Sequence, residues 1–442
     1  MKLYKALIGV CVAGSLSLPM KAVAAEAVMR LSLSDVLERA RQNNYTIKAA
    51  RSRVDQADGR VVQSRQAFLP KVTLSETLTV TNDPGAALVY KLQQKSLQNS
   101  DFEASKMTHP DVINDFNTSL QVMQPIYNAD ASTARSMALT AKKAQELMTR
   151  RAEETINLQL RRLYYGVLLA KKNIEAVDQS IIIMQGYSAE AARGYSAGML
   201  GKSDKLSTDV RLAELQEQKL LLQDEVNNAA DMLKVMLQLE SSVTLVLTGD
   251  LVVDGSLPGR EASASSVNRS DIKAYEAFRQ VASYQSEMIR QSKLPRLNAF
   301  LQTSLHSNNI FGGGAGWALG MNMQWNIFDG MATAGRMQEA KAQEREAMYT
   351  YEAAKSNTQA ELNKSSRSFK TAKTRIGVAS KSLEEARVSF DYIGKKYKTG
   401  MAMTFELLMR EQAFTWAKMR LNQATYDYCV SKSEFDYYKG GS

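Results

Sequence analysis

Apolar residues recur at alternating steps of four and three over two long stretches of the chain. This spacing is the heptad pattern of helices that pack as coiled coils. The first seam consists of Ile156, Leu160, Leu163, Val167, Ala170, Ile174, Val177 and Ile181. The second consists of Leu362, Ser365, Phe369, Ala372, Ile376, Ala379, Leu383, Ala386, Phe390, Ile393 and Tyr397, and a shorter third one of Leu222, Val226, Ala229, Leu233 and Met236. We therefore expect long, closely packed helices in both halves of the chain.

Proline placement supports these helices. No proline lies between Ile126 and Leu257, and none follows Pro295. Proline costs about 3 kcal/mol inside a helix, so stretches this long without one favour uninterrupted helices. A helix from about 129 to 193 would be roughly 100 Å long at 1.5 Å per residue. Globular domains rarely contain such a rod.

The chain repeats itself. Tyr195-Ser196-Ala197-Gly198-Met199 matches Tyr397-Lys398-Thr399-Gly400-Met401, an offset of 202 (397 minus 195). Leu69 matches Leu294 at 225, and Ile126 matches Ile327 at 201. The first half therefore carries 24 extra residues (225 minus 201), which fall around 82–115. One unit, read as helix, strand, loop, strand, long helix, turn and helix, occurs twice.

The period changes to two in four segments: 72–80, 116–122, 297–306 and 317–325. Each predicts a strand with one mostly apolar and one mostly uncharged polar face. Glu76 interrupts the first apolar face and Phe300 the third polar face. A half-buried soluble sheet would show similar alternation, but the strand lengths and the tryptophans Trp317 and Trp325 favour a transmembrane barrel.

Four strands cannot close a barrel that holds a channel, and an open sheet edge cannot lie in lipid. The barrel therefore requires several chains. Three chains would give twelve strands and two would give eight. In each chain, 82–115 would be the longer outer loop and 311–316 the shorter one. Two short strands or a compact collar are expected at 243–247 and 251–253, between the halves.

The chain begins with a signal for export. Lys2 and Lys5 precede an apolar run from Ala6 to Leu18, and Ala22-Val23-Ala24 fits a cleavage site. We therefore assign 1–24 to a signal peptide cut after Ala24. A transmembrane anchor is the alternative, but the run is too short to span about 30 Å of hydrocarbon.

Charge and chemistry exclude several function classes. The net charge is +10, or +7 without Lys2, Lys5 and Lys21, and acidic side chains are interleaved with the basic ones, so nucleic acid is not the expected partner. Neither His109 nor His306 fits a metal-ligand spacing. We find no nucleophile elbow or phosphate loop, and predict no enzyme, cofactor or metal. A secreted coiled-coil scaffold or interaction protein remains the alternative to a channel.

The arrangement resembles the TolC family of outer-membrane efflux and secretion ducts across the whole mature chain. The resemblance is carried by the order of several motifs across both repeats. They are Phe68-Leu69-Pro70 and Lys293-Leu294-Pro295 before the hairpins, Gln124-Pro125-Ile126-Tyr127-Asn128 and Trp325-Asn326-Ile327-Phe328-Asp329-Gly330 after them, and the two Tyr-x-x-Gly turns.

The resemblance implies a mixed α/β membrane protein, in which each chain gives four strands to a trimeric, twelve-stranded transmembrane β-barrel. A long coiled-coil α-helical barrel would extend into the periplasm of a Gram-negative cell. We assign 25–240 to the first repeat, 241–265 to an inter-repeat equatorial segment and 266–442 to the second repeat.

The implied function is an export duct in the cell outer membrane, part of a tripartite efflux pump or a type I secretion system. It would pass small molecules or proteins delivered by an inner-membrane transporter of the RND or ABC type. The implied partners are two further copies in a homotrimer, a periplasmic adaptor (membrane fusion) protein, that pump and outer membrane lipid.

The resemblance also implies a gate at the periplasmic tip, marked by the turn glycines Gly198 and Gly400. Asp204 and Glu406, each six residues after a turn glycine, match the carboxylates that constrict the pore, and Tyr397 matches a tyrosine that contacts the first of them. Both acids also suit the first turn of an ordinary helix. Ala402 and Met409 replace charged gate residues of the family, which leaves apolar contacts through Met401 and Met403 as a second way to hold the tip.

Overall fold

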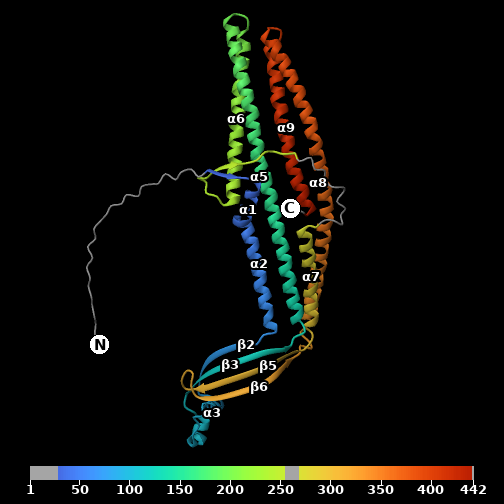
Figure 1. Cartoon of the computed structure of the whole chain (residues 1–442). Helices are drawn as coiled ribbons and strands as arrows, with labels where there is room; N and C mark the ends of the chain where they lie inside the picture. Colours follow the sequence, from blue (N-terminus) through green and yellow to red (C-terminus); the bar gives the residue numbers. More distant parts are fainter. Residues whose placement is uncertain (1–27, 254–267, 441–442) are drawn as a thin grey trace, which may run out of the picture.

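The protein is a long rod with a small sheet at one end and two helix turns at the other, as the ribbon of Figure 1 shows. The structure, a computed structural model, describes residues 28–253 and 268–440. The predicted signal peptide, 1–24, lies outside these residues, and so does the part 254–265 of the predicted inter-repeat segment. Within the described residues, no helix is both long and apolar enough to cross a membrane.

Two helices run along most of the rod, and shorter ones pack beside them. The long pair is α5 (Ala131–Ser196) and α8 (Ala332–Lys398), as predicted from the proline-free stretches. The others are α1 (Leu33–Asn43), α2 (Tyr45–Gln63), α6 (Lys202–Leu237), α7 (Ser270–Gln291) and α9 (Thr404–Lys439). Towards the turns α6 packs on α5 and α9 on α8, and towards the sheet α2 and α7 take their places.

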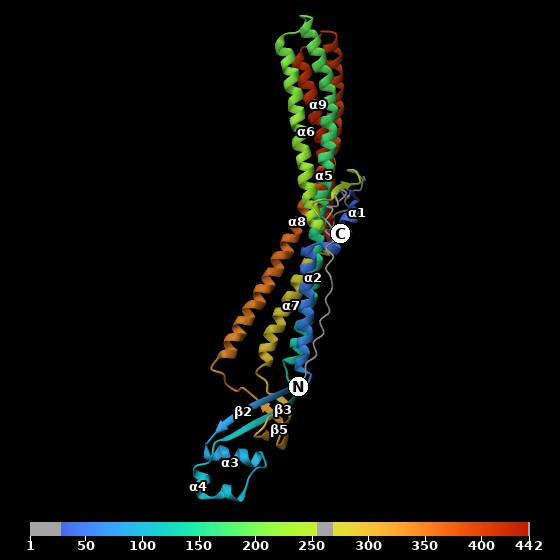
Figure 2. The same ribbon diagram turned by 90° about the vertical axis from the view of Figure 1, so that its left-hand side faces the viewer.

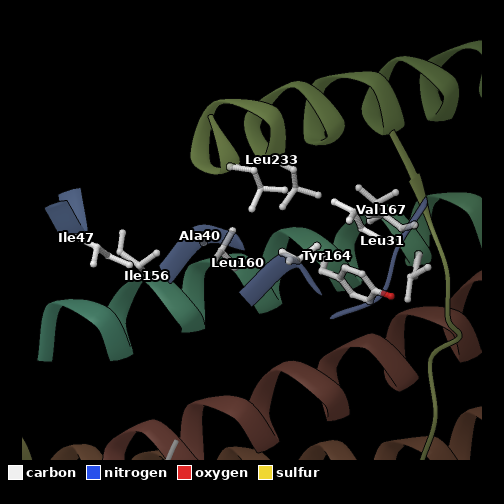
Figure 3. Close-up of a cluster of buried hydrophobic side chains, with 12 residues drawn as sticks. Leu31, Ala40, Ile47, Ile156, Leu160, Tyr164, Val167 and Leu233 are labelled. Atoms are coloured by element: carbon white, nitrogen blue, oxygen red, sulfur yellow. The ribbon is translucent and has the colours of Figure 1, made fainter. Parts of the chain in front are cut away.

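The predicted seams are the buried faces of these helices. Leu160, Val167 and Leu233 lie in one core cluster, where α1, α2, α5 and α6 meet (Figure 3). Phe369 and Ala372 lie in a second cluster, between α8 and α9. Seam positions that are small, such as Ala372, let the paired helices approach closely.

The shorter helices are joined end to end. At one junction Asn44 caps α2 through the amide nitrogens of Thr46 and Ile47, and its own amide donates to the carbonyl of Met236 at the end of α6 (2.9 Å). At the other, the amide nitrogen of Asn268 donates to the carbonyl of Lys439 at the end of α9 (3.4 Å). In effect α6 continues into α2, and α9 continues into α7.

The two junctions occupy equivalent places in the repeat. Arg269, the N-cap residue of α7, lies 225 residues after Asn44 (269 minus 44), the N-cap residue of α2. This is the offset of the Leu-Pro motifs. Gln238 and Gly440, the C-cap residues of α6 and α9, are 202 apart (440 minus 238), and both have positive φ (54° and 85°). The repeat seen in the sequence therefore extends to the caps of the helices.

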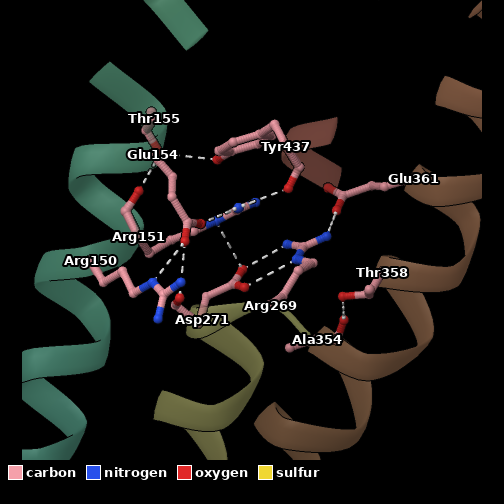
Figure 4. A network of polar contacts seen from close by, with 11 residues as sticks. Arg150, Arg151, Glu154, Thr155, Arg269, Asp271, Ala354, Thr358, Glu361 and Tyr437 are labelled. Atoms are coloured by element: carbon pink, nitrogen blue, oxygen red, sulfur yellow. Dashed lines mark hydrogen bonds and ion pairs between the residues drawn. The ribbon is translucent and has the colours of Figure 1, made fainter. Parts of the chain in front are cut away.

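The second junction is a buried ionic network (Figure 4). Arg269 donates two hydrogen bonds to Asp271 (3.0 and 2.6 Å) and one to Glu361 of α8 (2.5 Å). Arg151 of α5 pairs with Glu154 (3.0 Å) and lies 3.5 Å from the ring centre of Tyr437. Burial opposes ionisation of Asp271, but hydrogen bonds from Arg269 hold its pKa below the usual value. The network ties α5, α7, α8 and α9 together at mid-length.

The four predicted strands form one antiparallel sheet with the order β2-β3-β5-β6. The strands are β2 (Lys71–Thr81), β3 (Ile113–Tyr127), β5 (Arg296–Ser307) and β6 (Gly314–Gln324). Neighbouring strands run in opposite directions along the whole order, so the two hairpins lie side by side. Both outer strands, β2 and β6, leave an open edge in the single chain.

The register aligns like residues across the sheet. One row across the four strands is Val72, Val122, Leu301 and Leu319, and the next row is Thr73, Gln121, Gln302 and Ala318. Residues directly opposite one another share a face, so the sheet has one apolar and one mostly polar face. Phe300, the predicted exception on the polar face, lies over Gly320, where a Cβ would be only 2.8 Å from its ring. The ring fills the space that glycine leaves.

Two expectations for the connecting segments need correction. The collar contains one of the two expected strands, β4 (Thr244–Leu247), while 251–253 forms none. At its start the amide of Leu251 donates to the side chain of Asp250 (2.8 Å). Strand β4 pairs in parallel with β1 (Val28–Leu31), which the sequence did not reveal. The segment 82–115 is no simple loop, because it contains helices α3 (Pro84–Gln93) and α4 (Ala104–Thr108) and a short helical turn (Asn99–Phe102).

Candidate functional site at the helix turns

The two Tyr-x-x-Gly motifs form the same turn. The amide of Gly198 donates to the carbonyl of Tyr195 (3.0 Å), and that of Met199 donates to Gly194 (2.8 Å). In the second repeat Gly400 donates to Tyr397 (3.0 Å) and Met401 to Lys396 (2.8 Å). Both are Schellman motifs, which need a left-handed residue after the helix. Gly198 and Gly400 supply this residue, with φ of 69° and 75°.

The predicted acids occupy equivalent positions after these turns. Asp204 and Glu406 are each the third residue of their helix, α6 and α9. The carboxylate of Asp204 accepts from the amide of Gly201 (3.2 Å) and so caps α6. Glu406 is exposed, and no ion pair within residues 28–253 and 268–440 holds it. Asp204 thus caps its own helix, whereas the Glu406 side chain is exposed to solvent.

Tyr397 lies in an aromatic cluster between the helix pairs. Its ring contacts that of Tyr187 of α5 edge-on (5.8 Å between ring centres), and Tyr187 also contacts Phe390 (6.3 Å). Phe390 stacks on Phe414 of α9 (5.7 Å). Burial raises the pKa of Tyr187. The cluster joins α5 of one hairpin to α8 and α9 of the other.

Within one chain the structure does not bring Tyr397 and Asp204 together. The hydroxyl of Tyr397 lies 3.5 Å from that of Thr404, which is its one hydrogen-bond partner among the described residues. Met401 and Met403 are exposed (69% and 75%), so they do not pack within the chain. A contact between Tyr397 and Asp204, and apolar contacts through the methionines, stay predictions for the assembled protein.

A buried ion pair links the hairpins below the turns. Arg211 of α6 donates to Glu411 of α9 (2.7 Å), whose side chain is fully buried. Thr415 donates to the same carboxylate (2.6 Å) and shares a hydrogen bond with Ser180 of α5 (2.5 Å). Helices α6 and α9 thus meet at this carboxylate, and α5 joins them through Thr415. Removing either charge alone would leave the other buried and unpaired.

Sequence reasoning missed this pair, because the repeat aligns acids of the two halves without showing their partners. Asp209 lies 202 residues before Glu411 (411 minus 209), but its partners, Lys205 and Ser188, belong to its own hairpin (2.7 Å each). Hydrogen bonds from these two side chains lower the pKa of Asp209. The equivalent acid of the second repeat instead bonds across to the first. Further polar contacts, such as Asn422 with Asn173 (3.0 Å), continue the link between α5 and α9.

The arrangement suits mechanical coupling between helices more than chemistry. Among the described residues, no group of three or more His, Cys, Asp or Glu side chains could hold a metal ion. The polar groups near the turns pair with one another across helices. They determine how the two hairpins pack together.

Comparisons with known proteins agree with this geometry. The family model described as "Outer membrane efflux protein" matches residues 36–237 and 262–434. No match was found among curated protein sequences.

Several solved structures share the fold. The CmeC outer membrane channel of Campylobacter jejuni is 17% identical with a TM-score of 0.81, covering 92% of this chain and 85% of its own. VceC of Vibrio cholerae is 15% identical with a TM-score of 0.77, and the match covers 93% of this chain and 96% of VceC. The MtrE channel of Neisseria gonorrhoeae, solved in its open state, is 15% identical with a TM-score of 0.76. The match covers 92% of this chain and 89% of MtrE.

Proposed function

We propose, from the premise that the chain belongs to the outer membrane efflux protein family, that three copies of it close one channel. A gate at the helix turns controls this channel. The chain is an outer membrane efflux channel with a periplasmic extension, and not an enzyme. Assembly, gate and partners are the proposed parts.

The in-register sheet carries the proposal of a trimer. Its apolar rows match the lipid-facing surface of a membrane barrel, and its polar rows match an aqueous lumen. Because β2 and β6 both have unpaired edges, the sheet must continue into other copies. Two copies would give eight strands, whose interior side chains can fill, whereas the twelve strands of three copies leave room for a channel. On the apolar face, Val72, Leu74, Leu78 and Val80 of β2 and Leu319 of β6 are 54–71% exposed. A soluble coiled-coil scaffold would not expose so many apolar side chains on one face.

We place the gate at the turns that carry Asp204, Glu406 and Tyr397. Three copies of each acid would ring a narrow pore and favour cations. The aromatic cluster around Tyr397 and the buried pair Arg211–Glu411 hold the two hairpins of each chain together, so opening requires them to shift.

The same end of the rod suits docking of a periplasmic adaptor that connects the channel to an inner-membrane pump. Met199, Met401, Met403 and Phe405 are 69–78% exposed there. Clustered exposed apolar side chains mark protein interaction sites. Lys202, Lys396 and Lys398 lie close to them along the chain, which favours an acidic partner surface.

The first experiment measures the mass and conductance of the detergent-extracted protein, by native mass spectrometry and planar-bilayer recording. We expect a trimer with a small, cation-favouring conductance. Asp204→Asn and Tyr397→Phe should enlarge the conductance, and Glu406→Gln should reduce the cation preference. Asp231→Asn, which removes an exposed carboxylate at the far end of α6, should change neither property. A water-soluble monomer or dimer without conductance would contradict the proposal.

A further inference from the structure

The segment between β2 and β3 folds into a small unit, which we call the outer lobe (residues 82–112). Asp83 caps α3 by accepting from the amide of Ala86 (2.8 Å). Lys91 of α3 pairs with Asp101 (2.7 Å), and this hydrogen bond lowers the pKa of Asp101. Ala87 is buried between the helices. The second hairpin has no equivalent unit, so the lobe accounts for the extra residues of the first repeat. Figure 2 shows it beyond the sheet, at the end of the rod opposite the helix turns.

Side chains dock the lobe on the sheet. Gln94, at the end of α3, donates to the carboxylate of Asp115 on β3 (2.9 Å). His306 on β5 bonds the other oxygen of that carboxylate (2.8 Å), and the ring of Tyr90 stacks on His306 (6.4 Å between ring centres). Asp115 and His306 are 1% and 8% exposed. Buried polar groups this well paired fix the lobe in one position.

A glycine on β6 makes a third contact. A Cβ built on Gly314 would overlap the carbonyl oxygen of Gln93, the last residue of α3. Any other residue at this position would push the helix away. Gly316, two residues along the same strand, has no such neighbour, since its Cβ would lie 3.8 Å from the hydroxyl of Ser304.

All three contacts lie on the polar face of the sheet. Asn117, His306 and Gly314 are directly opposite one another in the register, in the same set of rows as Gln121 and Gln302. Asp115 shares that face because it is two residues from Asn117. The lobe therefore leaves β2 but crosses the polar face to β6, the opposite edge.

We propose that the outer lobe narrows the external mouth of the channel and sets the largest solute that can leave it. The inference rests on the proposed function, in which the polar face is the lumen. A unit docked on that face near its outer end projects over the opening, and a trimer would hold three of them. Val89 and Leu92 of α3 are exposed and would face the remaining aperture or a second lobe. Cargo size would then be limited by this chain as well as by the pump.

The test measures access to the lumen from outside intact cells and so avoids the gate at the helix turns. A cysteine is placed on the polar face by Thr73→Cys and, as a control, on the apolar face by Leu74→Cys. The cells are treated with a small membrane-impermeant maleimide or with the same group on a polymer of several kilodaltons. We expect the small reagent to label only Thr73→Cys, and the polymer to label it slowly.

Undocking the lobe should admit the polymer. Gly314→Ala in the Thr73→Cys background should raise the rate of polymer labelling by about tenfold or more, because a Cβ that cannot fit displaces α3. Gly316→Ala should leave the rate unchanged. Gln94→Ala, which removes a docking hydrogen bond and leaves the sheet residues intact, should raise the rate in the same direction if Gly314→Ala does not fold.

The same labelling data distinguish failure of this inference from failure of the proposed function. If the polymer labels the parent as fast as Gly314→Ala and Gln94→Ala, or none of them, the lobe does not set the size limit. If the small reagent does not label Thr73→Cys, or labels Leu74→Cys as well, the polar face is not the lumen and the proposed function is wrong.

Discussion

At the scale of single residues, the turn glycines carry a clear conformational requirement. Gly198 and Gly400 have φ near 70°, a region that costs other residues about 1–2 kcal/mol. The tyrosine of each motif accepts the hydrogen bond from the glycine amide through its carbonyl, so its side chain is free for another role. For Tyr397 that role is the aromatic cluster between the hairpins.

Gly198→Ala and Gly400→Ala should therefore each destabilise the protein by about 1 kcal/mol. Gly186→Ala, in the interior of α5 where a Cβ meets nothing within 4 Å, should instead stabilise it by roughly 0.5–1 kcal/mol. The midpoint of heat-induced loss of helical circular dichroism measures both. Equal effects at Gly186 and Gly198 would argue against the strained-turn account.

At the scale of elements, the hairpins are held together by buried polar groups as well as by seams. The Arg211–Glu411 pair connects α6 to α9, and Thr415 and Ser180 extend it to α5. A buried ion pair contributes little against an apolar replacement, but half of one is costly. The pair therefore determines how α6 and α9 align more than how stable they are.

A double-mutant cycle tests this coupling. Arg211→Met and Glu411→Leu should each cost roughly 3–5 kcal/mol, while the double variant should cost far less than their sum. Lys205→Met, which breaks the half-exposed pair with Asp209, should cost below about 0.5 kcal/mol. Thermal midpoints of the four proteins supply the cycle. Additive losses in the double variant would show that the two charges do not interact.

At the scale of the whole molecule, the sheet and the rod present different surfaces. The sheet exposes apolar rows on one face, while the helices bury their seams within the chain and expose charged side chains. This division agrees with the proposal that the apolar face of the sheet lies in lipid while the helices lie in water.

Adjacent residues of β5 test that division. Leu301→Arg places a charge on the apolar face and should cost about 2–4 kcal/mol near the membrane centre, whereas Gln302→Arg on the polar face should be tolerated. The amount of folded, heat-modifiable oligomer in outer membrane fractions measures the difference. Comparable losses for both variants would mean that neither face lies in lipid.

The sequence by itself determined the local architecture, because local architecture follows from periodicity and from conformational limits on glycine and proline. The heptad seams around Val167 and Phe369 located the long helices, the alternation at 72–80 and 317–325 located strands, and the Tyr-x-x-Gly repeats located the turns. The decrease of the repeat offset from 225 to 201 also revealed the extra segment of the first half, which forms the outer lobe.

Only the tertiary structure decided which faces meet. A heptad shows that a helix has a partner but does not identify it, so the pairing of Arg211 with Glu411 and the stacking of Tyr187 against Tyr397 could not be derived. The same holds for Asp115, which bonds Gln94 and His306 from opposite ends of the sequence. These contacts join residues far apart along the chain, and their geometry depends on strand register and helix rotation, which no local pattern specifies.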